Sequence, residues 1–168
     1  MMQPEGFITT LFAVPLTDVT ISSTASAWDL VTLTAPSSGR VEIREIRLGQ
    51  KSTNIANNQQ VDVQMFTGTI SSSLGGAAIT PVNFKRWPAA PAAGTAAVGP
   101  SSAAASTTGA TLAYADATDY SGRFHWCAKD PEEFVLDYSM GFTLRMGAPG
   151  TPITVSGTVT FRELGKQK

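Results

Sequence analysis

The chain has 168 residues, a length that suits one domain built around a single core. Charged residues make up only 15% of it, and 12 basic residues are matched by 13 acidic ones. This balance lacks the positive excess of proteins that hold phosphate backbones, so we expect no nucleic-acid partner. No apolar run approaches the roughly 20 residues of a membrane span, and we expect no membrane partner.

Apolar and polar residues alternate along much of the chain, which is the period of a β-strand with one buried face. In chain order, the pattern and the turn residues between segments predict strands over Gly6–Val14, Thr17–Ser22, Trp28–Thr34, 40–49, 61–66, Ile79–Phe84, Thr111–Ala115, Arg123–Ala128, Glu133–Leu136, 142–146 and 153–162. Helices are expected to be short or absent. The spacing is typical of a β-sandwich or jelly roll, and we predict one all-β domain over residues 1–168.

A regular strand over residues 40–49 could not turn all of its apolar residues to one face. Val41 and Ile43 are at odd positions, whereas Ile46 and Leu48 are at even positions. A helix would also explain the change. Since β-branched residues dominate the apolar positions, we favour a strand with a β-bulge near Arg44–Glu45. Its Arg and Glu residues are expected to form cross-strand charge pairs on a solvated face.

The last predicted strand contains Gly157 among its apolar positions. Glycine weakens a strand interior, so its presence there predicts a bulge or a close approach of two backbones.

Residues 88–110 carry no charge and no aromatic side chain, and Val98 is their one large aliphatic residue. The prolines and glycines would break a helix, so we predict an extended loop or arm. It is either a flexible linker or an arm that becomes ordered on a neighbouring subunit. Residues 1–15 are a second candidate arm.

Residues that could carry chemistry are few. His125 is the one histidine, which excludes histidine-clustered metal sites and paired-histidine mechanisms. We interpret His125 as a satisfied barrel or interface residue, and the single cysteine, Cys127, as a packing residue. We therefore expect no metal, no cofactor and no small-molecule substrate, and predict that the chain is not an enzyme.

Three tryptophans remain, and Trp87 is the best candidate for exposure because it precedes Pro88 and follows Lys85 and Arg86. An exposed aromatic ring can stack on a sugar, which would suit a carbohydrate- or receptor-binding module of a phage head fibre or tail. More often such a residue anchors a loop against its own domain or a partner. Retention on a polysaccharide column that is lost in Trp87→Ala would favour the first alternative.

Four segments, taken together, resemble a family of small structural proteins of tailed-phage and prophage heads, of the cement or decoration type. They are Arg40–Gln50, Gly75–Val82, Asp130–Glu133 and Ser156–Glu163, and the Ala-rich stretch lies between the second and third. Order and spacing match from about Trp28 to Glu163. The chain departs from the family pattern at 137–141 and at 125–127.

The resemblance implies a jelly-roll-like module, commonly a homotrimer, that binds the major capsid protein on the outside of an icosahedral shell and stabilises it. The protein would be made in the host cytoplasm and located in the virion. Neutral extended segments would cross the seams between capsid subunits and add strands to exposed edges. The candidate contacts come from the two arms and the 40–51 edge: Phe7, Ile8, Arg40, Arg44, Arg47, Trp87, Pro88, Pro91, Val98 and Pro100.

Overall fold

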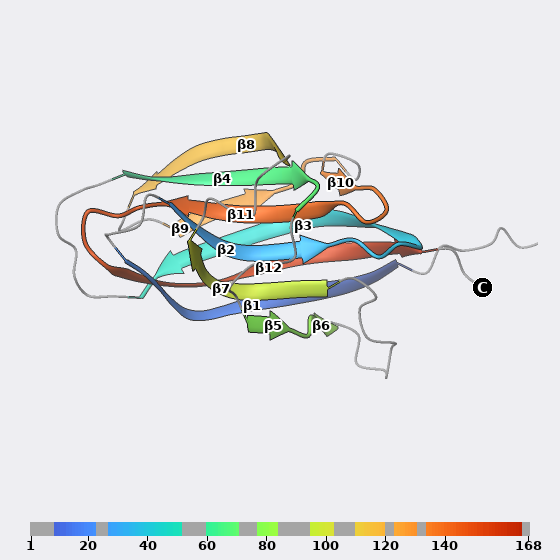
Figure 1. Ribbon diagram of the computed structural model, residues 1–168, viewed down its shortest axis with the longest axis horizontal. Helices are drawn as coiled ribbons and strands as arrows, with labels where there is room; N and C mark the ends of the chain where they lie inside the picture. Colours follow the sequence, from blue (N-terminus) through green and yellow to red (C-terminus); the bar gives the residue numbers. More distant parts are fainter. Residues whose placement is uncertain are drawn as a thin grey trace, which may run out of the picture.

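The computed structural model describes residues 9–22, 27–51, 60–70, 77–83, 95–102, 110–119, 123–130 and 134–165. These residues form two antiparallel sheets packed face to face, so the predicted all-β sandwich is confirmed (Figure 1). The strands are β1 (Thr9–Ile21), β2 (Ala27–Thr34), β3 (Gly39–Gln50), β4 (Gln60–Gly68), β5 (Ala77–Ile79), β6 (Val82–Asn83), β7 (Thr95–Ser102), β8 (Ala110–Asp119), β9 (Arg123–Cys127), β10 (Val135–Leu136), β11 (Gly141–Gly147) and β12 (Ile153–Gly165).

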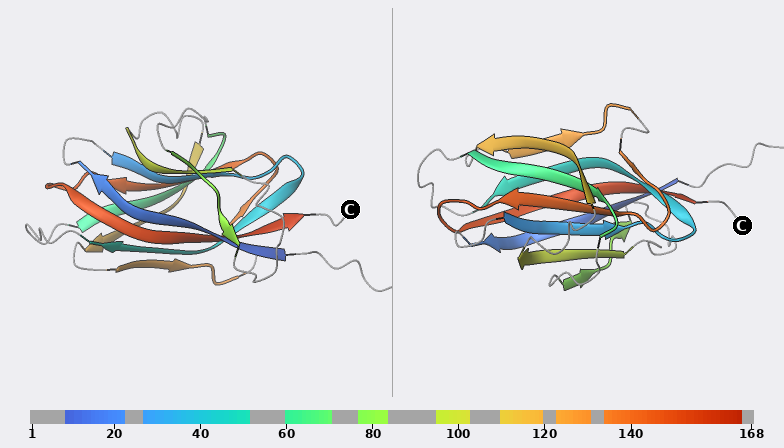
Figure 2. Two further views of the ribbon diagram at one scale, coloured as in Figure 1. Left: turned by 90° about the horizontal axis from the view of Figure 1, so that it is seen from below. Right: turned by 45° about the horizontal axis from the view of Figure 1, so that its top comes forward.

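Eight of these strands have the connectivity of a jelly roll. Sheet A contains the order β9-β3-β12-β1, and sheet B contains β2-β11-β4-β8. The chain passes from one sheet to the other at each step along these eight strands, except between β4 and β8. Strand β10 also pairs with β3, beside β9. The two layers are seen edge-on in Figure 2.

An insertion between β4 and β8 adds strands on one side of the sandwich. Strand β6 pairs with β1 in sheet A, and strand β7 pairs with β2 in sheet B. Strand β5 pairs with β7 and ends sheet B on that side. The insertion therefore covers the edges of β1 and β2, while β8 and β9 end their sheets on the other side.

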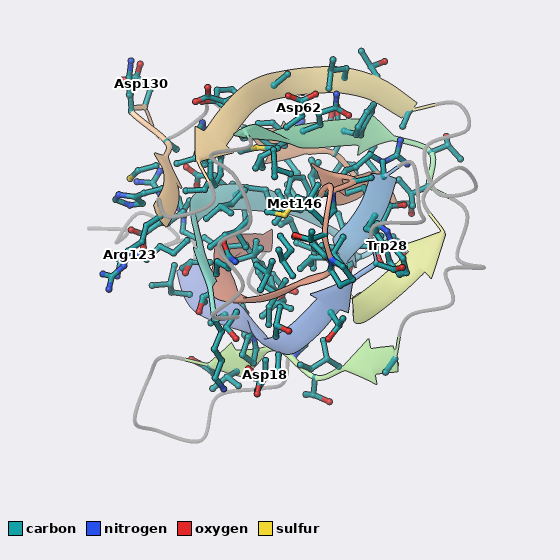
Figure 3. All side chains as sticks on the ribbon, turned by 90° about the vertical axis from the view of Figure 1, so that its left-hand side faces the viewer. Asp18, Trp28, Asp62, Arg123, Asp130 and Met146 are labelled. Atoms are coloured by element: carbon teal, nitrogen blue, oxygen red, sulfur yellow. The ribbon has the colours of Figure 1, made fainter. Side chains whose placement is uncertain are left out.

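The core lies between the two sheets and is formed by every second side chain along the strands of each sheet. Phe12 and Phe161 stack with their ring centroids 5.5 Å apart, at the β1–β12 pair. In the end-on view of Figure 3, Met146 lies among the side chains between the layers, and it is 4% exposed. Arg123 and Asp130 project outward in the same view.

A chain of aromatic rings continues the core toward β8. Phe142 contacts Phe134, Phe134 contacts Trp126, and Trp126 contacts Tyr114, each edge-to-face. Edge-to-face pairs stabilise beyond the area that they bury, so these rings tie both sheets together at the β8–β9 side.

The predicted bulge in β3 is confirmed. Thr160 of β12 lies opposite Glu45, and the next residue, Phe161, lies opposite Ile43, which leaves Arg44 as the extra residue. The shift lets Val41, Ile43, Ile46 and Leu48 all face the core.

Three strand predictions were wrong in detail. The two strands expected over Gly6–Val14 and Thr17–Ser22 are one strand, β1, with a bulge at 17–18 where Asp18 has φ 53°. Pro15 does not break it, because β6 pairs only with Phe12 and Ala13 and leaves the edge at Pro15 free of a ladder partner. The strand expected over Ile79–Phe84 is divided by the buried Pro81 into β5 and β6, which belong to different sheets.

The extended loop predicted over 88–110 was also wrong in its central part. Residues 95–102 form β7, a strand paired on both sides within this chain. Two residues, Gly99 and Pro100, lie opposite Leu30 alone, so the proline sits in a bulge where its missing N–H removes no regular ladder bond. Residues 88–94 and 103–109, and residues 1–8 of the N-terminal arm, lie outside the described residues.

The close approach predicted at Gly157 is confirmed. A Cβ atom built on Gly157 would overlap the carbonyl oxygen of Arg47 and would lie 2.9 Å from Leu48 Cδ2. A Cβ on Gly49, in the neighbouring strand, would meet no atom closer than Ser156 O at 4.0 Å.

We predict that Gly157→Ala lowers the free energy of unfolding by about 2–3 kcal/mol, because the clash is with backbone that cannot rotate away. Gly49→Ala should change it by less than about 1 kcal/mol. Urea denaturation of the wild type and both variants measures the difference, and equal stability of the two variants would contradict the prediction.

Candidate partner-binding surfaces

Strand β3, which carries three of the predicted contacts, is an interior strand. It pairs with β12 on one side and with β9 and β10 on the other, so the expected free edge at 40–51 does not exist. Arg40, Arg44 and Arg47 nevertheless project from the outer face of sheet A. Each of them is held by an acidic residue of its own chain: Asp137, Glu42 and Glu45 respectively.

Glu42 is fully buried, although it lies on the outer face of its sheet. Its Oε1 accepts a hydrogen bond from Arg44 Nη1 at 2.5 Å, and its Oε2 accepts one from Arg162 Nε at 2.7 Å and a second from Arg162 Nη2. The side chains of Arg44 and Arg162 are 31% and 30% exposed. The expected cross-strand pair is confirmed, since Glu42 and Arg162 are register partners, but the expected solvation of Glu42 was wrong.

Glu45 joins a second group of charges on the same face. His125 Nε2 lies 2.7 Å from Glu45 Oε1, and Arg47 Nη2 also lies 2.7 Å from it. Burial raises the pKa of the Glu45 carboxyl, but hydrogen bonds from His125 and Arg47 outweigh this effect and lower it. His125 is thus satisfied, as expected, by a hydrogen bond with Glu45 on the adjacent strand.

Strand β9 alternates strictly, with Phe124 and Trp126 buried and Arg123, His125 and Cys127 exposed. The interpretation of Cys127 as a packing residue was therefore wrong. The segment is apolar on one face only, and Cys127 has the parity of the exposed face. Among the described residues, no group of three or more His, Cys, Asp or Glu side chains could hold a metal ion.

Sheet B contains a buried ion pair that no pattern in the sequence predicted. Arg145 of β11 donates to both carboxylate oxygens of Asp29 on β2, at 2.8 and 3.4 Å, and Asp29 is 2% exposed. Burial raises the pKa of Asp29, and the bonds and charge of Arg145 oppose that rise. The guanidinium also lies 4.9 Å from the ring centroid of Phe66, so its charge is satisfied within the domain.

The exposed side chains of the edge strands of sheet B differ from those on the outer face of sheet A, because they are small and mostly uncharged. Exposed residues here are Ala77 and Ala78 of β5, and Thr111, Leu112, Ala113, Ala115 and Asp116 of β8. Leu112 is 48% exposed and pairs in register with the half-buried Phe66. The exposed surface of these two strands is therefore mostly uncharged, and Leu112 is a large apolar side chain on it.

The other predicted contacts are placed only in part. Val98 and Pro100 lie in β7, between β2 and β5, so their backbone belongs to the domain's own sheet. Phe7, Ile8, Trp87, Pro88 and Pro91 lie outside the described residues. Of the other two tryptophans, Trp126 is buried, and Trp28 packs against the core with its Nε1 donating to the Ser22 carbonyl.

One exposed aromatic residue, Tyr138, lies in the turn between β10 and β11. It is 52% exposed, and the Arg40 guanidinium lies 5.8 Å from its ring centroid. The following residue, Ser139, has φ 59°, and its N–H donates to the Pro36 carbonyl. The turn is thus fixed against the neighbouring loop.

Comparisons with known proteins give little further information. No family model matches the chain, and no curated protein matches its sequence. A chain of the cryo-EM atomic structure of broad bean stain virus is 10% identical, has a TM-score of 0.24, and covers 100% of this chain and 94% of that one. A chain of the infectious bursal disease virus (Gx strain) structure is 11% identical, has a TM-score of 0.23, and covers 94% of this chain and 41% of that one. TM-scores this low do not establish a shared fold or function.

The described part of the chain contains no helix long and apolar enough to cross a membrane.

We predict that Glu42→Gln lowers the free energy of unfolding by about 2–3 kcal/mol, since it leaves two arginines beside a neutral amide. This loss of stability should be smaller than the largest losses seen when a buried ion pair is broken, because both arginine side chains are partly exposed to water. Glu45→Gln on the same strand is the matched control and should cost less than about 1 kcal/mol, because its partners are mostly exposed. Thermal or urea unfolding at neutral pH measures both, and an equal cost would contradict the burial of Glu42.

Proposed function

We propose that the chain is a non-enzymatic structural protein of a tailed-phage virion, which binds the outside of the major capsid shell and stabilises it. The observation that supports this best is the division of its surface. The charged residues of β3 are engaged in ion pairs within the domain, whereas the edge strands of sheet B present small, mostly neutral residues. A neutral surface can be buried against a partner without the desolvation cost of charges.

The jelly-roll connectivity is compatible with this role and also with others, since viral capsid proteins, lectins and cupins share it. The resemblance to head cement proteins favours the virion over the other two. On this proposal the protein assembles as a homotrimer and is made in the host cytoplasm. The neutral edge strand of the insertion, β5, replaces the predicted arm as the first candidate for the capsid-binding surface.

We predict that particles stripped of this protein by mild dissociation lose infectivity or release DNA at a lower temperature, and that re-added protein restores the original temperature. Ala78→Glu, which places a charge on exposed β5, should weaken reattachment roughly tenfold or more. Ala148→Glu, at an exposed loop position between β11 and β12, should not. Particles with the same heat stability with and without the protein would refute a stabilising role.

A second candidate function is a carbohydrate- or receptor-binding module, and Tyr138 is the observation that favours it. An exposed ring in a fixed turn, with the Arg40 guanidinium and the Asp137 carboxylate beside it, matches the groups that stack on sugars and bind their hydroxyls.

If that function holds, the wild type should be retained on a glycan array or polysaccharide column, and Tyr138→Ala should abolish retention without loss of stability. Val82→Ala, which also truncates an exposed apolar side chain, is the matched control and should leave binding unchanged. Absence of retention of the wild type on any glycan would count against this candidate.

A further inference from the structure

Among the described residues, strand β8 ends sheet B on the side opposite the strands of the insertion. We propose that two copies of the chain join through β8 as antiparallel strands, so that sheet B of one copy continues into sheet B of the other. The contact does not depend on the proposed function. In a trimeric protein it would join two trimers, and in a monomeric one it would make a dimer.

The position of β8 distinguishes it from the other edges of the sandwich. On the insertion side, sheet B ends in β5, with three residues, and sheet A ends in β6, with two. At the other end of sheet A, β9 and β10 have five and two. Strand β8 has ten residues, and it pairs with β4 along its full length. In Figures 1 and 2 no strand lies beyond it.

The sequence of β8 lacks most of the features that prevent edge pairing. It contains neither lysine nor proline, and its exposed residues from Thr111 to Ala113 and at Ala115 are small or apolar. One bulge, at Ala113, separates the register partners of Met65 and Phe66. A long edge with unpaired backbone groups and few charges is a template for another strand.

The distribution of side chains makes β8 complementary to a second copy of itself. Register with β4 places Tyr114 on the face toward the core and Ala115 on the outer face. If a two-fold axis passes through Ala115, each Tyr114 comes opposite Asp116 of the other copy. The other aspartate, Asp119, lies four residues from the axis, beyond the position opposite the Ala113 bulge, so no aspartate faces another.

The Tyr114–Asp116 pairing is chemically favourable. Within one chain the Tyr114 hydroxyl lies 3.1 Å from Asp116 Oδ2 and donates to it. A carboxylate accepts more than one hydrogen bond, so two tyrosines and two aspartates across the axis can form one network. Because Ala115 is small, the two side chains that meet on the axis do not crowd each other on the outer face.

A charge-swap experiment at Ala115 tests the proposal. Ala115→Lys and Ala115→Glu each place two like charges on the axis, so each variant alone should have half the mass of the wild type by sedimentation velocity or native mass spectrometry. An equimolar mixture should recover the full mass as a mixed assembly. Ala78→Lys on β5 is the matched control and should keep the wild-type mass.

The proposal is overturned if the wild type and both Ala115 variants have the same mass, or if the mixture of the two variants does not reach the mass of the wild type.

A cross-linking variant gives an independent readout that does not add charge. Ala115→Cys in a Cys127→Ser background should form an intermolecular disulfide on mild oxidation, because opposite residues on an antiparallel axis lie about 4.5–5.5 Å apart at Cα. Ala78→Cys in the same background should remain reduced at the same concentration. Equal cross-linking at both positions, or none at Ala115, would refute the β8 contact.

Discussion

Each strand of this sandwich must keep its apolar residues on the face between the two sheets, and the fold depends on how the chain meets that constraint. A strand has a strict period of two, so one extra residue would turn every following side chain to the wrong face. The ladders between the described strands contain five register shifts, in the pairs of β1 with β12, β11 with β2, β12 with β3, β2 with β7 and β4 with β8. At Arg44 the shift returns the second half of β3 to the core.

The same shift creates the most buried charge of the outer face. The bulge puts Arg44 within reach of Glu42 on its own strand, while the β12 register brings Arg162 to the same carboxylate from the other side. A buried carboxylate with one partner is costly, whereas three charge-assisted hydrogen bonds satisfy it. The bulge at Arg44 and the ion pairs of Glu42 with Arg44 and Arg162 therefore form one structural unit. This unit explains why β3 tolerates dense charge in the interior of a sheet.

Periodicity predicted the sandwich, the β3 bulge and the close approach at Gly157, since each of these follows from a local pattern. Strand β7 was not predictable in this way, because eight small residues between Thr95 and Ser102 carry no apolar alternation and pair only when β2 and β5 are beside them. The burial of Asp29 and Glu42 was not predicted for a related reason. Each is an ordinary polar position in its own strand and becomes buried only through a partner 116 or 120 residues away.

The low charge of the chain has different consequences on the two sides of the sandwich. On the insertion side, neutral residues allow β7 to lie between two strands of its own sheet, so the segment that looked available for a neighbour is largely consumed in completing the domain. On the opposite side, β8 is also rich in small residues, with two aspartates, and has no further strand to pair with among the described residues. A neutral strand lowers the cost of burial wherever it is placed, and the topology alone decides whether that burial occurs within one chain or between two.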